Sequence, residues 1–179
     1  MKEEYLFKSE RLGFRNWIAS DIEKLAAINS NEEIMQFFPS LPNLDQTKDF
    51  VDRMQQMYRE KGYCYFAVDL LEDSNFIGFI GIAYKDFESE ITPCIDIGWR
   101  LDNKYWNKGY ATEGAKRCLK YGLEDLNIKK IKAIAPKINL RSIQVMENIG
   151  MKKKLEFKHP LLKGNKRLEN CVCYEITNH

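Results

Sequence analysis

The feature that most constrains the fold is a strand–helix–strand segment in the second half of the chain. Residues 94–101 (CIDIGWRL) and 130–135 (KIKAIA) are rich in strand-forming residues, and residues 111–126 between them place small and apolar side chains on one helical face. A crossover of this length between two strands of one sheet is typical of parallel neighbours. The sheet is therefore predicted to contain a parallel pair.

The remaining predicted strands are antiparallel neighbours. A polar turn at 72–75 joins two of them in a hairpin, and a basic loop lies between the last two. These strands comprise residues 12–17, 63–70, 76–84, 154–157 and 171–177. The order predicts a mixed α/β sheet rather than a fully parallel, doubly wound one.

Apolar residues at helical spacing predict further helices. One begins at Asp21, a second begins within residues 43–45 and stops at Gly62, and a third is a short helix that Gly150 ends. No linker or repeat divides the chain, so we expect residues 1–179 to form a single domain.

Charge and apolar patterning exclude several classes of protein. The formal net charge is +2 and no basic stripe is present, which argues against nucleic-acid binding. The apolar runs are too short to cross a bilayer, and the N-terminal MKEEYLFKSERL lacks an apolar signal core. The five cysteines have spacings typical neither of a disulfide framework nor of a zinc site. We expect a cytoplasmic protein with reduced cysteines and no membrane partner.

Residues 106–113 (WNKGYATE) join the fourth predicted strand to the long helix. Gly109 permits backbone conformations denied to other residues, Ala111 leaves the helix start open, and Lys108 adds a positive charge. The unpaired amides and the dipole of a helix N-terminus favour a bound pyrophosphate. An ordinary turn is the alternative interpretation. Neither the nucleoside-triphosphate loop nor the three-glycine dinucleotide pattern is matched.

Residues 105–114 (YWNKGYATEG) resemble the coenzyme A loop of the GNAT N-acetyltransferase superfamily, and more narrowly its RimJ/RimL-type branch. Residues 97–101 (IGWRL) resemble the strand that pairs with pantetheine, and residues 139–151 (NLRSIQVMENIGM) resemble the helix beside the thiol arm. Asn107 stands where this family often has glycine, and Met146 stands where many members have a tyrosine that acts as the acid for the leaving thiolate. The resemblance implies a mixed, mostly antiparallel seven-stranded sheet, with a central parallel pair splayed into a V and about four flanking helices.

The resemblance also implies an activity. An acetyl group would pass from acetyl-coenzyme A to a primary amine by direct attack on the thioester, with no metal. The acceptor would be the α-amine of a protein N-terminus or the amine of a small molecule, and the enzyme a monomer or a homodimer. The residues expected to bind the cofactor are Trp99, Arg100, Leu101, Trp106, Asn107, Lys108, Gly109, Tyr110, Ala111, Thr112, Asn139 and Ser142.

Two side chains are candidates for catalysis. Asp96 is the expected base, directly or through water, although an ordinary aspartate pKa of about 3.9 requires burial or a water relay for this role. A main-chain amide near Trp99 or Arg100 is the expected donor to the oxyanion. Ser142 is expected to donate a hydrogen bond to the leaving thiolate. The alternative is structural: Asn139 caps a helix, and Ser142 lies in its first turn. Glu113 is assigned a structural role.

Two other functions remain open. A polyamine or aminoglycoside acetyltransferase would need several carboxylates at one cleft, and a catalytically silent coenzyme A-binding sensor or interaction module would bind the cofactor without turnover. The acidic residues available for the first are Glu32, Glu33, Asp86, Glu88 and Glu90. The aromatic residues that could wall an acceptor pocket are Tyr84, Trp17, Phe37 and Phe38. His159 and His179 are expected to be solvated.

Overall fold

Within residues 5–178, which the computed structural model describes, one eight-stranded sheet has the order β1-β2-β3-β4-β5-β6-β8-β7. All neighbouring strands are antiparallel except β5 and β6, which are parallel. The strands are β1 (Phe7–Lys8), β2 (Leu12–Arg15), β3 (Tyr65–Leu70), β4 (Phe76–Lys85), β5 (Cys94–Leu101), β6 (Lys130–Pro136), β7 (Lys152–Lys158) and β8 (Asn170–Thr177). The predicted mixed sheet and its parallel pair are confirmed.

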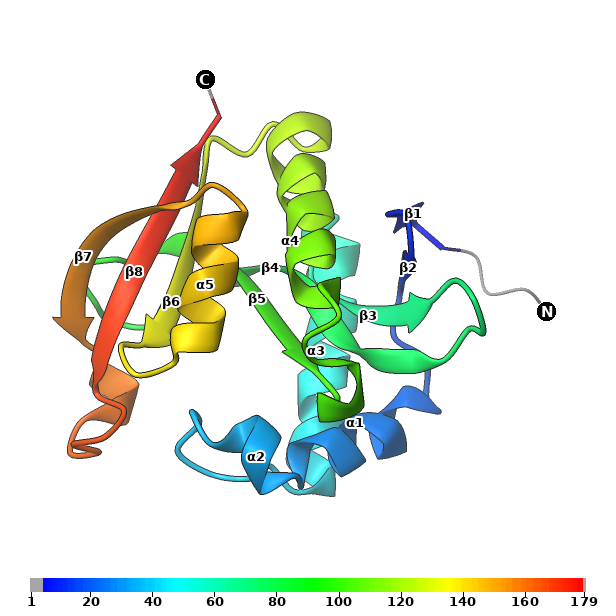
Figure 1. Ribbon diagram of the computed structural model, residues 1–179, viewed down its shortest axis with the longest axis horizontal. Helices are drawn as coiled ribbons and strands as arrows, with labels where there is room; N and C mark the ends of the chain where they lie inside the picture. Colours follow the sequence, from blue (N-terminus) through cyan, green and yellow to red (C-terminus); the bar gives the residue numbers. More distant parts are fainter. Residues whose placement is uncertain (1–4, 179) are drawn as a thin grey trace.

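The parallel pair opens into a V. Strands β5 and β6 are in register at Asp96 and Lys132, and they diverge beyond this point (Figure 1). The splay leaves one edge of the second half of β5 without a neighbouring strand. The V-shaped opening implied by the resemblance is therefore present.

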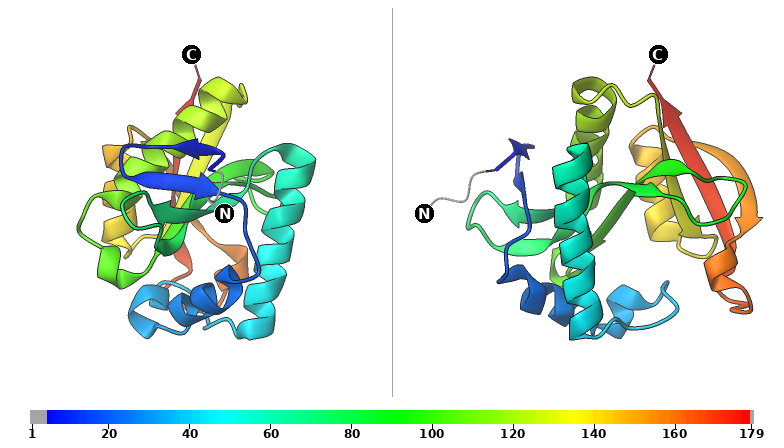
Figure 2. Two further views of the ribbon diagram at one scale, coloured as in Figure 1. Left: turned by 90° about the vertical axis from the view of Figure 1, so that its right-hand side faces the viewer. Right: turned by 180° about the vertical axis from the view of Figure 1, so that it is seen from behind.

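Five α-helices flank the sheet in the same described part of the chain. They are α1 (Asp21–Asn29), α2 (Glu32–Met35), α3 (Leu44–Lys61), α4 (Tyr110–Lys120) and α5 (Leu140–Asn148). Helices α4 and α5 cover the face seen in Figure 1, and α3 lies across the other face in the view from behind (Figure 2). Short helical turns follow as η1 (Asn103–Tyr105), η2 (Tyr121–Asp125) and η3 (Pro160–Leu162).

Two short elements were not predicted. Strand β1 has two residues and helix α2 has four, too few for a period of 2 or 3.6 to be visible. They account for the difference between the seven strands and four helices expected and those observed. The long predicted helix also differs, because α4 begins at Tyr110 and passes after Lys120 into a π-helical turn.

Local sequence signals set the bounds of α3. The side chain of Asn43 accepts a hydrogen bond from the amide of Gln46 at 2.8 Å, and the Gln46 side chain accepts one from the amide of Asn43 at 2.9 Å. This reciprocal capping box begins the helix. Gly62 ends it at φ +75°, a conformation that glycine adopts without a Cβ penalty. Both predicted ends are confirmed.

A buried ion cluster fixes α1 to the sheet. Arg15 on β2 donates hydrogen bonds to Asp21 at the start of α1 at 2.7 Å and to Asp69 on β3 at 2.6 Å. The Arg15 guanidinium is the counter-charge of these two buried carboxylates. Removing the guanidinium would therefore lower the stability of the fold. The cluster holds α1, whose last residue Asn29 contacts β5 as described below. None of the helices within residues 5–178 has the length and apolar character needed to cross a membrane.

Candidate active site

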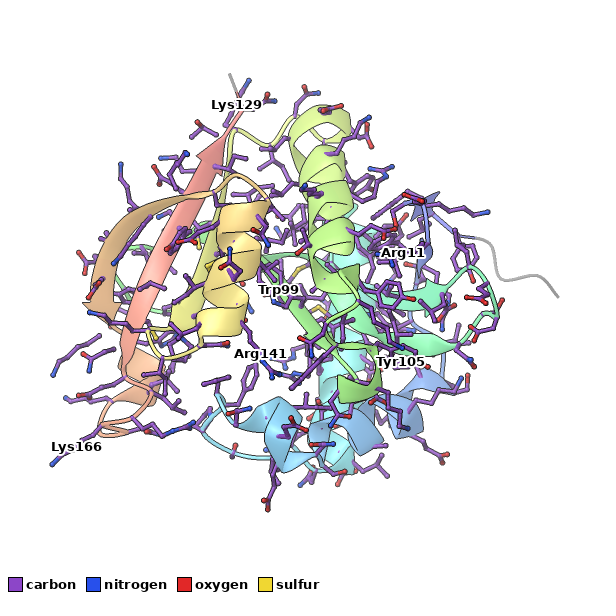
Figure 3. The ribbon with its side chains drawn as sticks, viewed as in Figure 1. Arg11, Trp99, Tyr105, Lys129, Arg141 and Lys166 are labelled. Atoms are coloured by element: carbon purple, nitrogen blue, oxygen red, sulfur yellow. The ribbon has the colours of Figure 1, made fainter. Side chains whose placement is uncertain are left out.

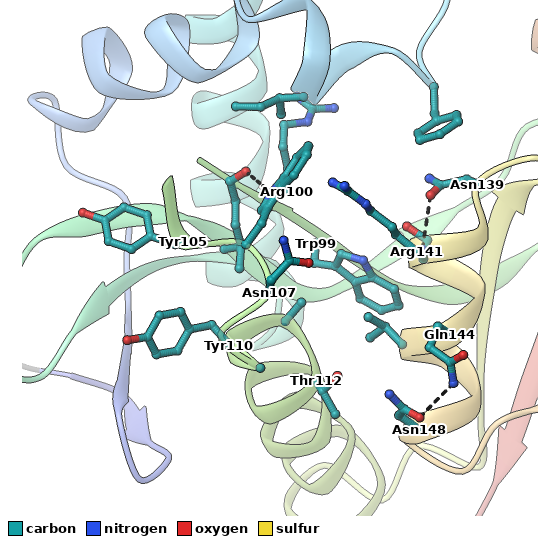
Figure 4. A pocket seen from close by; sticks show the side chains of 18 of the residues that line it. Trp99, Arg100, Tyr105, Asn107, Tyr110, Thr112, Asn139, Arg141, Gln144 and Asn148 are labelled. Atoms are coloured by element: carbon teal, nitrogen blue, oxygen red, sulfur yellow. Dashed lines mark hydrogen bonds between the residues drawn. The ribbon is translucent and has the colours of Figure 1, made fainter. Parts of the chain in front are cut away.

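A cavity of about 440 Å³ lies where β5 and β6 diverge, between the start of α4, the exposed face of α5 and the segment around α2 (Figure 4). Of the residues predicted to bind the cofactor, all except Lys108 line it. Those that line it are Trp99, Arg100, Leu101, Trp106, Asn107, Gly109, Tyr110, Ala111, Thr112, Asn139 and Ser142. The strand, loop and helix identified in the sequence thus meet at one cavity.

The loop before α4 contains two left-handed residues. Asn107 has φ +59° and Gly109 has φ +80°. Asparagine is among the few residues other than glycine that adopt this conformation readily. This explains why Asn107 can stand where the family often has glycine: the backbone there needs a positive φ, and asparagine provides it.

The N-terminus of α4 opens into the cavity without a side-chain cap. Gly109 is the N-cap residue and makes no capping hydrogen bond, while its carbonyl accepts the amide of Glu113 at 2.9 Å. The amides of Tyr110, Ala111 and Thr112 lie in the first turn, where no helical carbonyl is available to them. The combined amides and helix dipole favour an anion at this position.

Glu113 connects this loop to the N-terminal segment. Its carboxylate accepts hydrogen bonds from the Ser9 hydroxyl at 2.6 Å and from the main chain and Nε of Arg11, both at 2.7 Å. Arg11 also donates to the carbonyl of Lys108 at 3.0 Å and lies over the Tyr110 ring at 4.4 Å. Burial alone would raise the pKa of Glu113, but the hydrogen bonds from Ser9 and Arg11 lower it. Glu113 thus has the structural role expected of it: through Ser9 and Arg11 it connects the loop before α4 to the N-terminal segment, and we call this set of contacts the brace.

Helix α5 supplies the opposite wall. Asn139 is the N-cap residue, and its side chain accepts the amide of Ser142 at 3.2 Å, so it caps α5 and also lines the cavity. The Ser142 hydroxyl lines the cavity and has no hydrogen-bond partner within residues 5–178. Arg141 lies over the ring of Trp106 at 4.7 Å, and Figures 3 and 4 show it beside Trp99.

Several lining residues were missed in the sequence. Arg141, Gln144, Val145 and Asn148 line the cavity from α5. They recur at spacings of three and four, which place side chains on one helical face, so this signal was available. Tyr105 opens the motif of residues 105–114 and could have been included, whereas Ile34 lies in α2, a helix too short to carry such a signal.

The main chain of β5 presents donors and acceptors to the cavity. The amide of Asp102 bonds to the carbonyl of Ile77 on β4 at 2.9 Å, and this sets the phase of the β4–β5 ladder. In an antiparallel ladder, alternate residues direct their polar groups to opposite sides. The amides of Trp99 and Leu101 therefore point away from β4, towards the opening that β6 has left.

Asp96 lies at the apex of the V rather than on the cavity wall. It is buried, its Oδ2 accepts a hydrogen bond from the Tyr65 hydroxyl at 2.5 Å, and its Oδ1 has no partner within residues 5–178. Burial raises the pKa of Asp96 to about 6, although the charge of Lys85 and the hydrogen bond from Tyr65 act in the opposite direction. Asp96 does not line the cavity that contains Ser142.

Some of the aromatic and acidic residues proposed from the sequence line the cavity, and others lie elsewhere. Phe37 and Phe38 line it, whereas Trp17 is buried in the core and Tyr84 is exposed on β4. Of the five acidic residues, Glu33 lines the cavity and accepts a hydrogen bond from Asn103 at 2.8 Å.

The histidines were both expected to be solvated. For His159 this is wrong, because its ring is half-buried and stacks on Phe87 at 4.6 Å. Burial lowers the pKa of His159. His179 lies outside the described residues. No group of three or more His, Cys, Asp or Glu side chains in the described part of the chain is arranged to hold a metal ion.

Comparisons with known proteins agree with the geometry. A family model described as the acetyltransferase (GNAT) domain matches residues 11–152. The uncharacterized N-acetyltransferase YnaD of Bacillus subtilis is 32% identical over 158 residues, which cover 88% of each chain. The crystal structure of a GNAT-family acetyltransferase from Bacillus anthracis is 30% identical, with a TM-score of 0.80 over 96% of this chain and 97% of the other. The ribosomal-protein-S5-alanine acetyltransferase of Vibrio fischeri shares the fold, with a TM-score of 0.77 over 96% of each chain at 19% identity.

Proposed function

The chain belongs to the GNAT family of N-acetyltransferases, and from this premise we propose that its cavity holds acetyl-coenzyme A and delivers the acetyl group to a primary amine. The acceptor is the α-amine of a protein N-terminus or the amine of a small molecule. One observation supports this most directly. The uncapped N-terminus of α4 and the unpaired edge of β5 border the same cavity.

The lining residues fit the chemical groups of the cofactor. The amides that follow Gly109 suit a pyrophosphate, and the exposed guanidinium of Arg141 adds a positive charge nearby. The unpaired amide of Leu101 suits the peptide-like pantetheine arm, which can bond to β5 as another strand would. The side-chain amide of Asn139 lies on the far wall.

Acetyl-coenzyme A supplies a thioester that a neutral amine can attack. In the transfer an N–C bond forms, the C–S bond breaks, the amine nitrogen loses a proton and the thiolate gains one. The amide of Trp99 is placed to donate to the carbonyl oxygen as negative charge develops there. The Ser142 hydroxyl, free of other partners within the described chain, is placed to donate to the sulfur.

Asp96 is proposed to receive the amine proton through water. It lies three residues before Trp99 on the same strand, so it is close to the opening without lining the cavity. A pKa of about 6 suits a base that works near neutral pH, because the group is ionised there but still binds a proton appreciably. The partnerless Oδ1 is the atom available for this hydrogen bond.

Two measurements test the proposal. Calorimetric titration with acetyl-coenzyme A should show selective micromolar binding, with ATP and NADH as controls. Thiol release should then be followed with a panel of amines. Failure to bind acetyl-coenzyme A would refute the assignment of the cavity. Binding without thiol release from any amine would favour a coenzyme A-binding module, a role compatible with the buried Met146 at the position of the family's tyrosine.

A further inference from the structure

Arg100 and Trp99 are neighbours on β5 and face opposite sides of the sheet. Trp99 lies on the side of α4 and α5 (Figure 3). The guanidinium of Arg100 lies over the rings of Phe38 at 4.3 Å and Phe79 at 5.2 Å, and its Nη1 donates to Asn29 Oδ1 at 2.7 Å. Both residues line the cavity because the strand itself forms its floor where β6 has diverged. The Arg100 side chain therefore approaches the cavity from the face opposite the coenzyme A loop.

The positive charge of Arg100 has no counter-ion in the described part of the chain. Within residues 5–178 no carboxylate forms an ion pair with it, and its buried Nε has no hydrogen-bond partner. Its neutral partner Asn29 is itself buried and held by Thr47, to which its side-chain amide donates at 3.0 Å. Burial lowers the pKa of Arg100 to about 10, so the group is still charged at neutral pH. The Arg100 side chain is part-buried with its Nε atom fully buried, and a charge withdrawn from water without a partner is costly unless something else neutralises it.

The surroundings do not supply the missing anion. Asp96 faces the same side as Arg100, but one of its oxygens is occupied by Tyr65, over whose ring Lys85 lies at 5.0 Å. Among the charged side chains that line the cavity, Arg100 and Arg141 are positive and Glu33 is negative. A polycationic acceptor would meet more positive than negative charge in this cavity.

We propose that Arg100 determines acceptor specificity, and that the acceptor is an amine that also carries an oxyanion, such as a carboxylate or a phosphate. This rests on the proposed function, because it assigns the coenzyme A loop to one side of β5 and the acceptor to the other. The guanidinium offers the anion its unpartnered Nε and its remaining N–H donors, and an anion–guanidinium hydrogen bond in a buried site is stronger than one in water. The rings of Phe38 and Phe79 and the Asn29 amide hold the guanidinium in position for this contact.

The proposal is tested with acceptors matched in pairs. These are an amino acid and its carboxamide, and phosphoethanolamine and ethanolamine, with spermidine as the polycation. We expect kcat/KM for at least one anionic member to exceed that of its uncharged counterpart at least tenfold, and the better pair identifies the oxyanion. This comparison uses the unaltered protein, so it does not depend on the folding of a variant. Equal rates within both pairs, or a preference for spermidine, would overturn the proposal.

Variants then assign the effect to Arg100. Arg100→Gln should remove the preference, mainly by raising KM for the anionic amine, and Arg100→Lys should retain part of it. Arg53→Gln, which changes an exposed arginine on α3, is the matched control and should keep the preference. Unchanged preference in Arg100→Gln, with thermal unfolding and acetyl-coenzyme A affinity also unchanged, would refute the role of Arg100.

Binding separates this proposal from the proposed function. The anionic amine is titrated calorimetrically into the protein saturated with coenzyme A, which requires no turnover. Binding that Arg100→Gln abolishes would support the specificity role even if no acetyl transfer were found. Absence of transfer from every acceptor would count against the proposed function alone, whereas absence of any anionic-amine binding would count against the role of Arg100.

Discussion

The hydroxyl of Tyr65 on β3 donates a hydrogen bond of 2.5 Å to Oδ2 of Asp96 on β5. Both side chains are buried at the apex of the V, where β5 still pairs with β6. Asp96, whose pKa burial raises to about 6, thus lies at the point from which the cavity opens. The groups close to it include Tyr65 from β3, Lys85 from β4 and Cys173 from β8, and Lys132 on β6 is its register partner.

The first prediction concerns the pH dependence of activity. If Asp96 accepts the proton, its ionised form is the active one, so kcat/KM should show a limb that rises through about pH 6, below the further rise caused by ionisation of the acceptor amine itself. Asp96→Asn should lower activity at pH 8 by about 10²- to 10⁴-fold and remove this limb. Tyr65→Phe removes a hydrogen bond that lowers the pKa of Asp96, so the limb should move to higher pH. A pH profile that is the same in Asp96→Asn and the unaltered protein would exclude Asp96 as the base.

The second prediction concerns stability, and its sign follows from the same group. Folding raises the pKa of Asp96 from 3.8 to about 6, so the folded state binds this proton more tightly than the unfolded state; stability is lost as pH rises from about 4 to about 6, and the cost is constant above that. A tenfold change in proton affinity corresponds to about 1.4 kcal/mol, so the cost at pH 8 is about 3 kcal/mol. Asp96→Asn should therefore raise the free energy of unfolding at pH 8 and have little effect near pH 4. Urea denaturation at both pH values measures this, and destabilisation at pH 8 would contradict it.

The sequence predicted those parts of the fold that short-range patterns encode. The bounds of β5, the capping of α3 by Asn43 and Gly62, and the loop from Trp106 to Thr112 all follow from residues close together in the chain. Contacts between distant segments carry no such pattern. Arg11 meets Glu113 across 102 positions and Tyr65 meets Asp96 across 31, and both depend on the order of strands in the sheet.

The surroundings of each side chain on β5 were also beyond the sequence. Arg100 was grouped with the cofactor residues because it adjoins Trp99 in the motif. Alternation along the strand places the two on opposite faces, and only the position of α1 and Phe38 shows what Arg100 contacts. The sequence thus located the strand that carries the site but not what each of its two faces contacts.

The third prediction concerns the coenzyme A loop. Gly109→Glu should weaken acetyl-coenzyme A binding at least 100-fold, because it places an anion and a side chain where the pyrophosphate is expected. Gly62→Glu is the matched control, since Gly62 has a similar φ of +75° and open space around it. Both substitutions should lose about 1–2 kcal/mol of stability from the left-handed backbone. Equal affinities in the two variants, measured by calorimetry, would refute the placement of the pyrophosphate.

The fourth prediction concerns the brace between the N-terminal segment and α4. Glu113→Ala removes the acceptor for Ser9 and Arg11 and should cost about 1–3 kcal/mol of stability. It should also weaken acetyl-coenzyme A binding, because Arg11 no longer holds the Lys108 carbonyl and the loop loosens. Glu124→Ala, which removes an exposed carboxylate paired with Lys120, is the control and should change neither quantity by much. Unchanged stability in Glu113→Ala would show that the brace is unimportant.

The fifth prediction separates the two roles considered for Ser142. Its amide, not its hydroxyl, takes part in the cap formed by Asn139, so Ser142→Ala leaves the helix start intact. A thiolate is a moderately good leaving group, and one neutral donor should therefore help it only modestly. We expect Ser142→Ala to lower kcat about tenfold while the acetyl-coenzyme A dissociation constant changes less than about twofold.

Asn139→Ala provides the contrast for Ser142. It removes the cap and should cost about 1 kcal/mol of stability, and acetyl-coenzyme A should bind less tightly because the start of α5 frays. The two variants therefore differ in which quantity changes: kcat for Ser142, and stability with affinity for Asn139. If kcat is unchanged in Ser142→Ala, the hydroxyl contributes nothing to departure of the thiolate. The thiolate must then take its proton from water.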